Sequence, residues 1–334
     1  MTRFTIARAA VIAAGATTAL ALAACSSSGG KQEEQSSGAA GAVNAAAGPK
    51  LKFAMITHAP AGDTFFDIIR KGADAAAGKD NVTYEYSNSS NPSEQAKLIQ
   101  AAVDKKPDGI AVSIPNPGAV KGALDKAKAA GIPVVMFNAG ANDYQKLGAL
   151  MYYGQDESVA GEAAGKRLAD EGAKKVICVV QEQGQSQLEA RCDGVAKGFA
   201  GGSVEKVYVE GTNMPDVQTK ITGKLADKSI DRVLTLGAPF ALTAVKSVQE
   251  AGSQAKVATF DTNAELVGAL KDGKVEWAVD QQPYMQGYMA IDSLWFYKTN
   301  GNVLGGGDIV LTGPSFVDQS NVAQVFEYAK RGTR

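Results

Sequence analysis

From residue 51 onward, short runs of apolar residues alternate with segments of helical periodicity. The runs are apolar nearly throughout instead of alternating with polar residues, which indicates strands covered on both faces and therefore parallel sheets. Regular alternation of such strands with helices predicts doubly wound α/β domains. The expected strands are 51–57, 82–87, 109–115, 132–138, 148–154, 174–180, 205–210, 231–237, 255–261, 275–280 and 308–313.

The helices expected between these strands begin at recognisable start signals. Asn91-Pro92-Ser93-Glu94 places Asn at the N-cap, Pro at the first helical position and Glu at the third. The expected helices are 64–77 (capped by Asp63 or Thr64), one starting at Asn91-Pro92, one from Asn116-Pro117 to Gly131, one from Asp156 to near Gly172, 186–200, 215–226, 239–251, 262–272, 284–299 and 321–330.

Ten or eleven strands are too many for one comfortable sheet in a chain of 334 residues, so two similar domains are expected. Ligands of doubly wound folds bind beyond the carboxyl ends of the strands. With two domains, these ends can face one another across a cleft.

Composition excludes several classes of function. The net charge of −1 gives no reason to expect nucleic acid as a partner. His58 is the single histidine, which removes most metal sites and most His-dependent catalysis. There is no phosphate-binding G-x-x-x-x-G-K-[ST] loop and no G-x-S-x-G elbow, and Gly305-Gly306-Gly307 is interpreted as a loop before a strand. We therefore expect no cofactor and no metal, and we do not expect an enzyme.

The first 49 residues predict export. Arg3 and Arg8 precede a short apolar segment, 9–24, as in a signal peptide. The segment ends in Leu22-Ala23-Ala24-Cys25, which resembles the bacterial lipobox, in which the Cys carries the lipid. Residues 1–24 are thus the expected signal peptide, Cys25 the expected lipidation site and 25–49 a flexible tether rich in Ser, Gly and Ala. The expected location is the outer face of the cytoplasmic membrane.

Cys178 and Cys192 are the other two cysteines. Export would place them where disulfides persist, but spacing alone does not prove a bond. The sequence is compatible with a disulfide between Cys178 and Cys192 and also with two buried thiols.

An ordered set of short motifs resembles the type I periplasmic-binding-protein fold, in its ribose-binding and LacI-like sugar-binding branch. The motifs are GDTFFDIIRKGA (62–73), NPSEQ (91–95), PDGIAVSIPNPGAV (107–120), AGIPVVMFN (130–138), GQDESVAGEAAG (154–165), EARCDGVAKGF (189–199), VATFDTN (257–263) and AVDQQPYMQGY (278–288). The resemblance implies two Rossmann-like lobes joined by a three-segment hinge, with crossings near 153–156, 281–284 and 309–313. The implied lobes are 51–153 plus 284–309, and 156–281 plus 310–334.

The resemblance also implies ligand-binding positions in the first lobe. Asp63 precedes two aromatic residues, Phe65 and Phe66, in the loop that in this family contacts the sugar. Aromatic rings stack on a sugar because its C–H faces are apolar while its rim is polar. His58 lies at the end of the same strand and is a further candidate, although a lone histidine more often has a structural role.

Three implied ligand-binding positions come from the second lobe and the hinge. Arg191 matches the helix arginine whose guanidinium can donate two parallel hydrogen bonds. Asp261 matches the aspartate after a strand, and a carboxylate suits two adjacent hydroxyl groups. Gln281 matches the hinge glutamine, which both donates and accepts.

The chain departs from the ribose-type pattern at two places. Asn138-Ala139 stands where that pattern has an Asp-Arg pair, and Gly237-Ala238 stands where it has Asn-Asp. Asn138 remains a ligand-binding candidate, and Ser113, Asn116 and Asn213 are the residues expected to compensate. These departures argue against ribose and for another polyhydroxylated ligand: an aldose, a ketose, a linear polyol, a cyclitol or a furanosyl signal.

The resemblance therefore predicts a monomeric solute-binding lipoprotein that closes on its ligand and delivers it to the permease of an ABC importer. A sensory receptor that presents a sugar-like signal to a membrane signalling protein would use the same fold and cleft. A transcription regulator of the related LacI type is excluded, because the export signal stands where a DNA-binding segment would lie.

Overall fold

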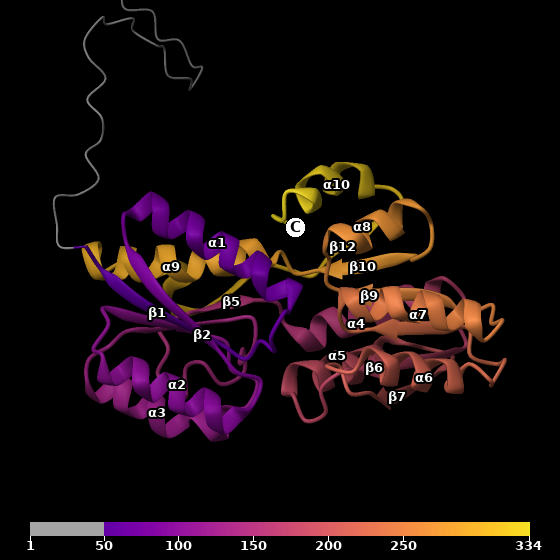
Figure 1. The fold of residues 1–334 in the computed structure, drawn as a ribbon, viewed down its shortest axis with the longest axis horizontal. Coiled ribbons are helices and arrows are strands. Elements are labelled where there is room, and N and C mark those ends of the chain that lie inside the picture. The colour runs from indigo at the N-terminus through magenta and orange to yellow at the C-terminus, as the bar shows by residue number, and fades with distance from the viewer. Residues whose placement is uncertain (1–49) are drawn as a thin grey trace, which may run out of the picture. The chain divides into compact units, whose positions relative to one another are not determined.

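The computed structural model describes residues 50–334, so the predicted signal peptide, lipidated Cys25 and tether lie outside the described residues. The described chain forms two six-stranded sheets (Figure 1). The first has the order β11-β5-β4-β3-β1-β2 and the second the order β12-β10-β9-β8-β6-β7. The prediction of two doubly wound α/β domains is confirmed.

All strands of the first sheet are parallel. In the second sheet only β12 runs antiparallel, against β10. The strands are β1 (Lys52–Thr57), β2 (Thr83–Asn88), β3 (Gly109–Val112), β4 (Val134–Phe137), β5 (Tyr152–Gly154), β6 (Lys175–Val180), β7 (Ser203–Tyr208), β8 (Arg232–Thr235), β9 (Lys256–Phe260), β10 (Trp277–Asp280), β11 (Ile309–Leu311) and β12 (Ser315–Asp318).

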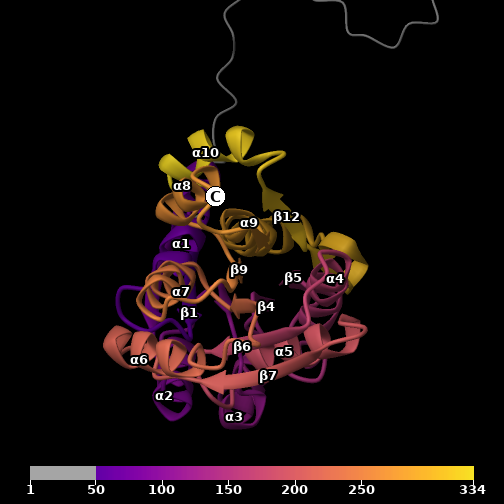
Figure 2. The ribbon, with the colours of Figure 1, turned by 90° about the vertical axis from the view of Figure 1, so that its right-hand side faces the viewer.

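Helices cover both faces of each sheet. The helices are α1 (Thr64–Asp80), α2 (Pro92–Asp104), α3 (Pro117–Ala129), α4 (Glu157–Asp170), α5 (Ser186–Gly198), α6 (Met214–Lys224), α7 (Ala238–Glu250), α8 (Ala264–Lys271), α9 (Pro283–Asn300) and α10 (Val322–Lys330), with a 3₁₀ turn at Leu304–Gly307. In the first lobe α1 and α9 lie on one face and α2 and α3 on the other (Figure 1). In the second lobe α4 and α7 lie on opposite sides of the sheet (Figure 2).

Successive residues of a central strand enter opposite cores, which explains why the strands are apolar throughout. In β1, Phe53 and Met55 pack with the core under α1 and α9, whereas Ala54 and Ile56 pack with the core under α2 and α3. Side chains alternate between the two faces of a strand, so a sheet covered on both faces requires apolar residues at every position.

The chain crosses between the lobes at three places: after β5, after β10 and after β11. The third lies in the predicted range 309–313, but the lobe boundary predicted after residue 309 lies after Leu311. The predicted strand 308–313 is shorter, and β11 pairs with β5 of the first sheet, so Val310 and Leu311 belong to the first lobe and not to the second. The chain then bends at Gly313-Pro314 into β12, which the sequence reasoning missed. Gly313 lies so close to the second crossing that an added Cβ would be 2.8 Å from the carbonyl oxygen of Asp280.

Cys178 and Cys192 form a disulfide in the structure, with an S–S distance of 1.96 Å. The bond joins the middle of β6 to α5 inside the core under α4 and α5. Of the two alternatives left open by the sequence, the structure therefore contains the disulfide.

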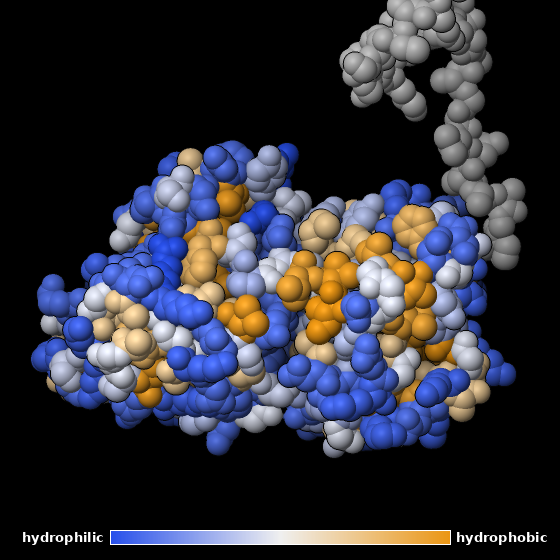
Figure 3. All heavy atoms as spheres, turned by 180° about the vertical axis from the view of Figure 1, so that it is seen from behind, coloured by the Kyte–Doolittle hydropathy of each residue, from blue (hydrophilic) through white to orange (hydrophobic). Residues whose placement is uncertain are grey.

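The described residues contain no helix that is long and apolar enough to cross a membrane. Apolar side chains do gather on the face of the first lobe turned away from the viewer in Figure 1, as Figure 3 shows. Exposed apolar residues are common on folded proteins, so this group by itself assigns no partner.

The contact between α1 and α9 generates a prediction. A Cβ at Gly72 of α1 would be 1.9 Å from the carbonyl oxygen of Tyr284. We expect Gly72→Ala to destabilise the protein by about 1–3 kcal/mol, because the two helices would have to move apart. Gly78→Ala is the matched control, since it lies on the same helix with no atom near the added methyl group; it should be neutral or stabilise by up to about 1 kcal/mol. Urea unfolding measures the free energy of unfolding of the two variants. Equal free energies of unfolding for Gly72→Ala and Gly78→Ala would contradict the prediction.

Candidate functional site

The carboxyl ends of several parallel strands of both sheets face a cavity of about 310 Å³ between the lobes. This volume lies at the small end of the range for small-molecule sites. Both lobes and the hinge contribute to its wall. The predicted residues in the wall are His58, Asp63, Phe65, Phe66, Asn138, Arg191, Asp261 and Gln281.

Asp63 is held by its role as the N-cap of α1. One of its carboxylate oxygens accepts hydrogen bonds from the backbone N–H groups of Phe65 at 2.8 Å and Phe66 at 3.4 Å. The cap fixes both aromatic residues at the first turn of the helix. Burial raises the pKa of Asp63, and the two backbone N–H groups only partly offset this.

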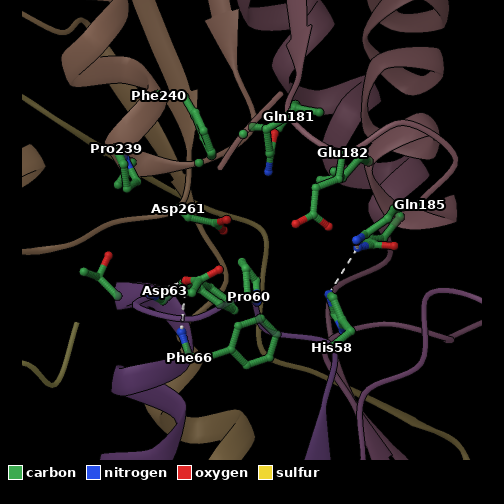
Figure 4. Close-up of a pocket in the computed structure, with 18 of the residues that line it drawn as sticks. His58, Pro60, Asp63, Phe66, Gln181, Glu182, Gln185, Pro239, Phe240 and Asp261 are labelled. Atoms are coloured by element: carbon green, nitrogen blue, oxygen red, sulfur yellow. Dashed lines mark hydrogen bonds between the residues drawn. The ribbon is translucent and has the colours of Figure 1, made fainter. Parts of the chain in front are cut away.

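Phe66 forms an apolar part of the cavity wall. Its ring meets the His58 ring edge-on at 5.0 Å and the Phe65 ring at 5.5 Å. Phe240, at the start of α7, lies across the cavity from Phe66 (Figure 4). The predicted aromatic contribution of the first lobe is therefore joined by an aromatic residue of the second lobe that the sequence reasoning missed.

The departure at Gly237 has a physical reason. An added Cβ there would be 3.1 Å from the ring of Phe240 and 3.7 Å from the side-chain nitrogen of Gln181. Phe240 thus crowds the space beside Gly237, whereas Gln181 lies at an ordinary contact distance, and both line the cavity. The polar side chain of the ribose-type pattern is replaced here by an aromatic ring and an amide.

His58 is buried between the lobes. Its Nδ1 is 2.9 Å from the Ser113 hydroxyl, and its Nε2 is 3.3 Å from the side-chain nitrogen of Gln187 in the second lobe. Because that amide nitrogen donates, His58 Nε2 accepts and Nδ1 carries the proton. Desolvation lowers the pKa of His58 to about 4, and the nearby Arg191 charge acts in the same direction.

Arg191 is 3% exposed, and its guanidinium pairs inside the protein. Its Nε and one terminal nitrogen donate to the two carboxylate oxygens of Glu157 at 2.6 and 3.0 Å. The other terminal nitrogen donates to the Leu236 carbonyl at 3.1 Å and to Asp261 at 3.4 Å. The two parallel hydrogen bonds expected for a ligand are thus made with Glu157, a residue that the sequence reasoning missed.

Asp261 connects Arg191 to the hinge. Gln281 donates to Asp261 at 2.6 Å, and Asn138 of the first lobe approaches Gln281 at 3.4 Å. Burial raises the pKa of Asp261 to about 6, although Arg191 and Gln281 both act to lower it. Hydrogen bonds therefore run from the second lobe through the hinge to the first.

Asn138 and Asp261 occupy matching places in the two lobes. Each follows the last residue of a strand, β4 or β9, and each has a left-handed backbone, with φ of 64° and 66°. Asn and Asp tolerate this conformation better than most residues, and strained backbone often marks binding sites.

Three predicted residues lie outside the cavity wall. Ser113 lies behind it and holds His58. Asn116 starts α3 and lines a separate outer groove. Asn213 caps α6, where its side chain accepts a hydrogen bond from the N–H of Asp216 at 3.3 Å. Their expected compensating role at the ligand is not supported by these positions.

The loop between β6 and α5, together with the first turn of α5, supplies wall residues that the sequence reasoning missed. Their amides and carboxyl come from the run Gln181-Glu182-Gln183-Gly184-Gln185-Ser186-Gln187 directly after β6. A run of polar residues directly after a strand was the sequence signal that could have predicted these wall residues. The members in the wall are Gln181, Glu182, Gln185 and Gln187. Residues 50–334 contain no cluster of His, Cys, Asp and Glu able to hold a metal ion.

The similarity of this chain to known proteins defines the class to which a protein with this geometry belongs. Residues 53–301 match the family model described as periplasmic binding protein domain. The chain therefore belongs to the periplasmic binding proteins, in the ribose-binding and LacI-like branch, and the family implies an extracytoplasmic location. The relatives are sugar-binding transport proteins, not enzymes.

Among solved structures, a carbohydrate transporter from Acidothermus cellulolyticus in complex with myo-inositol is 57% identical, with a TM-score of 0.84; the match covers 86% of this chain and 100% of that one. A solute-binding protein from Agrobacterium vitis bound with alpha-D-tagatopyranose is 26% identical over 84% of this chain and 98% of its own, with a TM-score of 0.74. A xylose/arabinose-binding protein from Sulfolobus acidocaldarius is 24% identical over 82% of this chain and 72% of its own.

The buried position of His58 generates a prediction. We expect its imidazole to stay neutral at pH 5.5, because its pKa is lowered to about 4 from a usual value of 6.5. Since the chain has one histidine, an NMR titration shows a single imidazole and needs no assignment. A titration midpoint of His58 near pH 6.5 in the folded protein would contradict the prediction of a neutral imidazole. The same titration in urea is the control and should return the usual value.

Proposed function

We propose that the protein captures a neutral polyhydroxylated solute, a monosaccharide, polyol or cyclitol, by closure of its two lobes, and delivers it to an ABC importer. The observation that carries the proposal is the cavity, which combines hydrogen-bonding side chains from both lobes and the hinge with aromatic rings on two sides. Such a wall matches a ring whose faces are apolar and whose rim carries hydroxyl groups.

Within this class, myo-inositol is the first candidate. A binding protein that is 57% identical over 86% of this chain holds myo-inositol in its structure. A cyclitol has hydroxyl groups around its whole rim, which suits acceptors placed on both sides of the cavity, such as Asp63 and Asp261.

The proposed mechanism is hinge closure around the solute. Side-chain contacts already join the lobes, among them Gln187 to His58, Ser186 to the Pro115 carbonyl, Asn263 to Thr64, Lys71 to the Arg331 carbonyl and Asn138 to the hinge residue Gln281. Closure brings these groups together and excludes water, so a ligand that contacts both lobes favours the closed state. ATP hydrolysis would take place on another subunit of the importer.

A ligand screen tests the proposal. We expect myo-inositol, or another member of a panel of cyclitols, hexoses, pentoses and linear polyols, to raise the melting temperature, since a ligand at 100 times its Kd stabilises by about 2.7 kcal/mol. Asp261→Asn should weaken binding by about tenfold or more, because hydrogen bonds to a charged group contribute about 1.5–3 kcal/mol.

Asp272→Asn is the matched control for that screen. Asp272 is an exposed carboxylate just beyond α8 in the same lobe, and within residues 50–334 it pairs only with Lys274 at 3.1 Å. The Asp272→Asn variant should bind the ligand with the same affinity as the unaltered protein. A shift caused by amino acids alone, with none from the polyhydroxylated compounds, would contradict the proposed ligand class.

Attachment to the membrane is tested separately. We propose that Cys25 carries a lipid and that residues 26–49 tether the binding domain to the membrane surface. Cys25→Ser should move the protein from the membrane fraction into the soluble exported fraction without changing its affinity for the ligand. Ser26→Ala is the control. Retention of the Cys25→Ser protein on the membrane would overturn the lipid anchor.

A further inference from the structure

One carboxyl group of the cavity, that of Glu182, has no hydrogen-bond or ion-pair partner in the part of the chain that the structure describes. Glu182, in the loop after β6, directs its carboxyl group into the cavity toward Asp261 and Asp63 (Figure 4). Within residues 50–334, no side chain or backbone N–H donates a hydrogen bond to it, and two causes, burial and the charge of Asp63, raise its pKa to about 7.

Asp63 faces Glu182 from the other lobe. One oxygen of Asp63 accepts the two capping bonds of α1, and the other is left for the cavity. The two carboxyl groups therefore belong to different rigid bodies, and closure of the cleft brings their charges together.

The nearby positive charges are already used. Arg191 is paired with Glu157 and Asp261, and Lys220, in the outer groove beside Glu182, is paired with Asp216 at 3.0 Å. His58 is neutral above about pH 4. The remaining titratable groups around Glu182, namely Asp261, Glu210 and Tyr208, are acids. Repulsion between Glu182 and Asp63 is therefore not cancelled inside the cleft.

We propose that Glu182 is a ligand-contacting residue, and that Glu182 and Asp63 form a pair of acceptors which hydroxyl groups of the ligand bridge from opposite lobes. Without such donors, closure brings two carboxylates together in a poorly hydrated space and is unfavourable. With them, each carboxylate accepts a hydrogen bond and closure becomes favourable. The site thus selects uncharged ligands with hydroxyl groups on both sides and disfavours acidic or phosphorylated sugars. This inference rests on the proposed function and assigns a specific residue to ligand selection.

The first test measures closure without any ligand. Closure buries Glu182 and brings Asp63 near, and both effects raise the pKa of Glu182 from its usual 4.5 to about 7. Protonation therefore favours the closed state as the pH falls through 7. Between pH 8 and pH 6 the closed-to-open ratio should rise by at most about tenfold.

Small-angle X-ray scattering of the purified protein reports this change as a smaller radius of gyration at pH 6 than at pH 8. Glu182→Gln, which is neutral at every pH, should be at least as compact at pH 8 as the unaltered protein is at pH 6. Glu265→Gln is the matched control, an exposed carboxyl group on the same lobe, and it should behave as the unaltered protein. A pH response that is unchanged by Glu182→Gln, or no response in either protein, would overturn the carboxyl pair.

The second test concerns the contact with the ligand. Glu182→Gln and Glu182→Ala both remove the charge and hence the repulsion, but only Gln keeps an acceptor oxygen. Calorimetric titration with myo-inositol, or with the member of the panel that binds, should give tighter binding for Gln than for Ala, by up to about tenfold for one hydrogen bond. Equal affinities of the two variants would show that Glu182 does not contact the ligand.

The failures of the two proposals are distinguishable. If the unaltered protein binds no polyhydroxylated compound, the proposed function and the ligand contact of Glu182 both fail, whereas the scattering experiment still decides whether the two carboxyl groups oppose closure. If the unaltered protein binds a polyol and the Gln and Ala variants bind it equally, the proposed function stands and the role of Glu182 falls.

Discussion

The geometry of the binding site depends on the buried charge of Arg191. A guanidinium that is 3% exposed is costly unless it is fully paired. Glu157 compensates it with two hydrogen bonds, and Asp261 shares the remaining charge. Arg191 therefore acts first as a fixed support, which holds Asp261 at the cavity and keeps it next to Gln281. The polar groups that face the cavity are thus positioned before any solute enters, which reduces the entropy lost on binding.

The same polar groups also connect the site to the hinge. Gln281 and Gln282 form the second crossing, and Gln286 at the start of α9 donates to Gln281 at 2.9 Å and to Thr312 at 3.1 Å. Gln282 has a left-handed backbone and donates to the Thr312 carbonyl at 2.7 Å, which ties the second crossing to the third. Because Gln281 also contacts Asp261 and approaches Asn138, a change in the cavity reaches the segments about which the lobes rotate.

The fold was largely predictable because both faces of each central strand are covered. Continuous apolar runs such as 53–56 are typical of strands buried on both faces when they recur between helices, and caps such as Asn91 mark where helices begin. The missed strand β12 is short and follows Gly313-Pro314, and its residues show no signal distinct from a loop. The error at Val310 and Leu311 has a similar origin, since the sequence does not show with which of two sheets a short strand pairs.

Part of the candidate site was predictable because a residue directly follows a strand. Asp63, Phe65, Phe66 and Arg191 also line the cavity but do not directly follow a strand, and they were predicted from the family resemblance. Asn138 and Asp261 each lie one residue beyond the last residue of a strand, so they had to lie at the edge where the two sheets meet. Ser113 also follows a strand but binds His58, and Asn213 binds the N–H of Asp216, because local partners compete for polar side chains. The position of Glu182 depends on the conformation of one loop, and that of Gln187 on where α5 begins after this loop, and no spacing rule fixes either.

The departure at Asn138-Ala139 has an electrostatic consequence. It removes one arginine and one aspartate from the cleft, and the arginine that remains in the wall, Arg191, has its two parallel hydrogen bonds occupied by Glu157. The groups directed at the solute are then carboxyl and amide side chains, as Asp63, Glu182, Gln181 and Asp261 show. A carboxylate only accepts hydrogen bonds, and an amide both accepts and donates. A wall of this kind gains most from a neutral solute with many hydroxyl donors and gains nothing from an added negative charge, so the loss of one arginine changes which ligands can close the cleft.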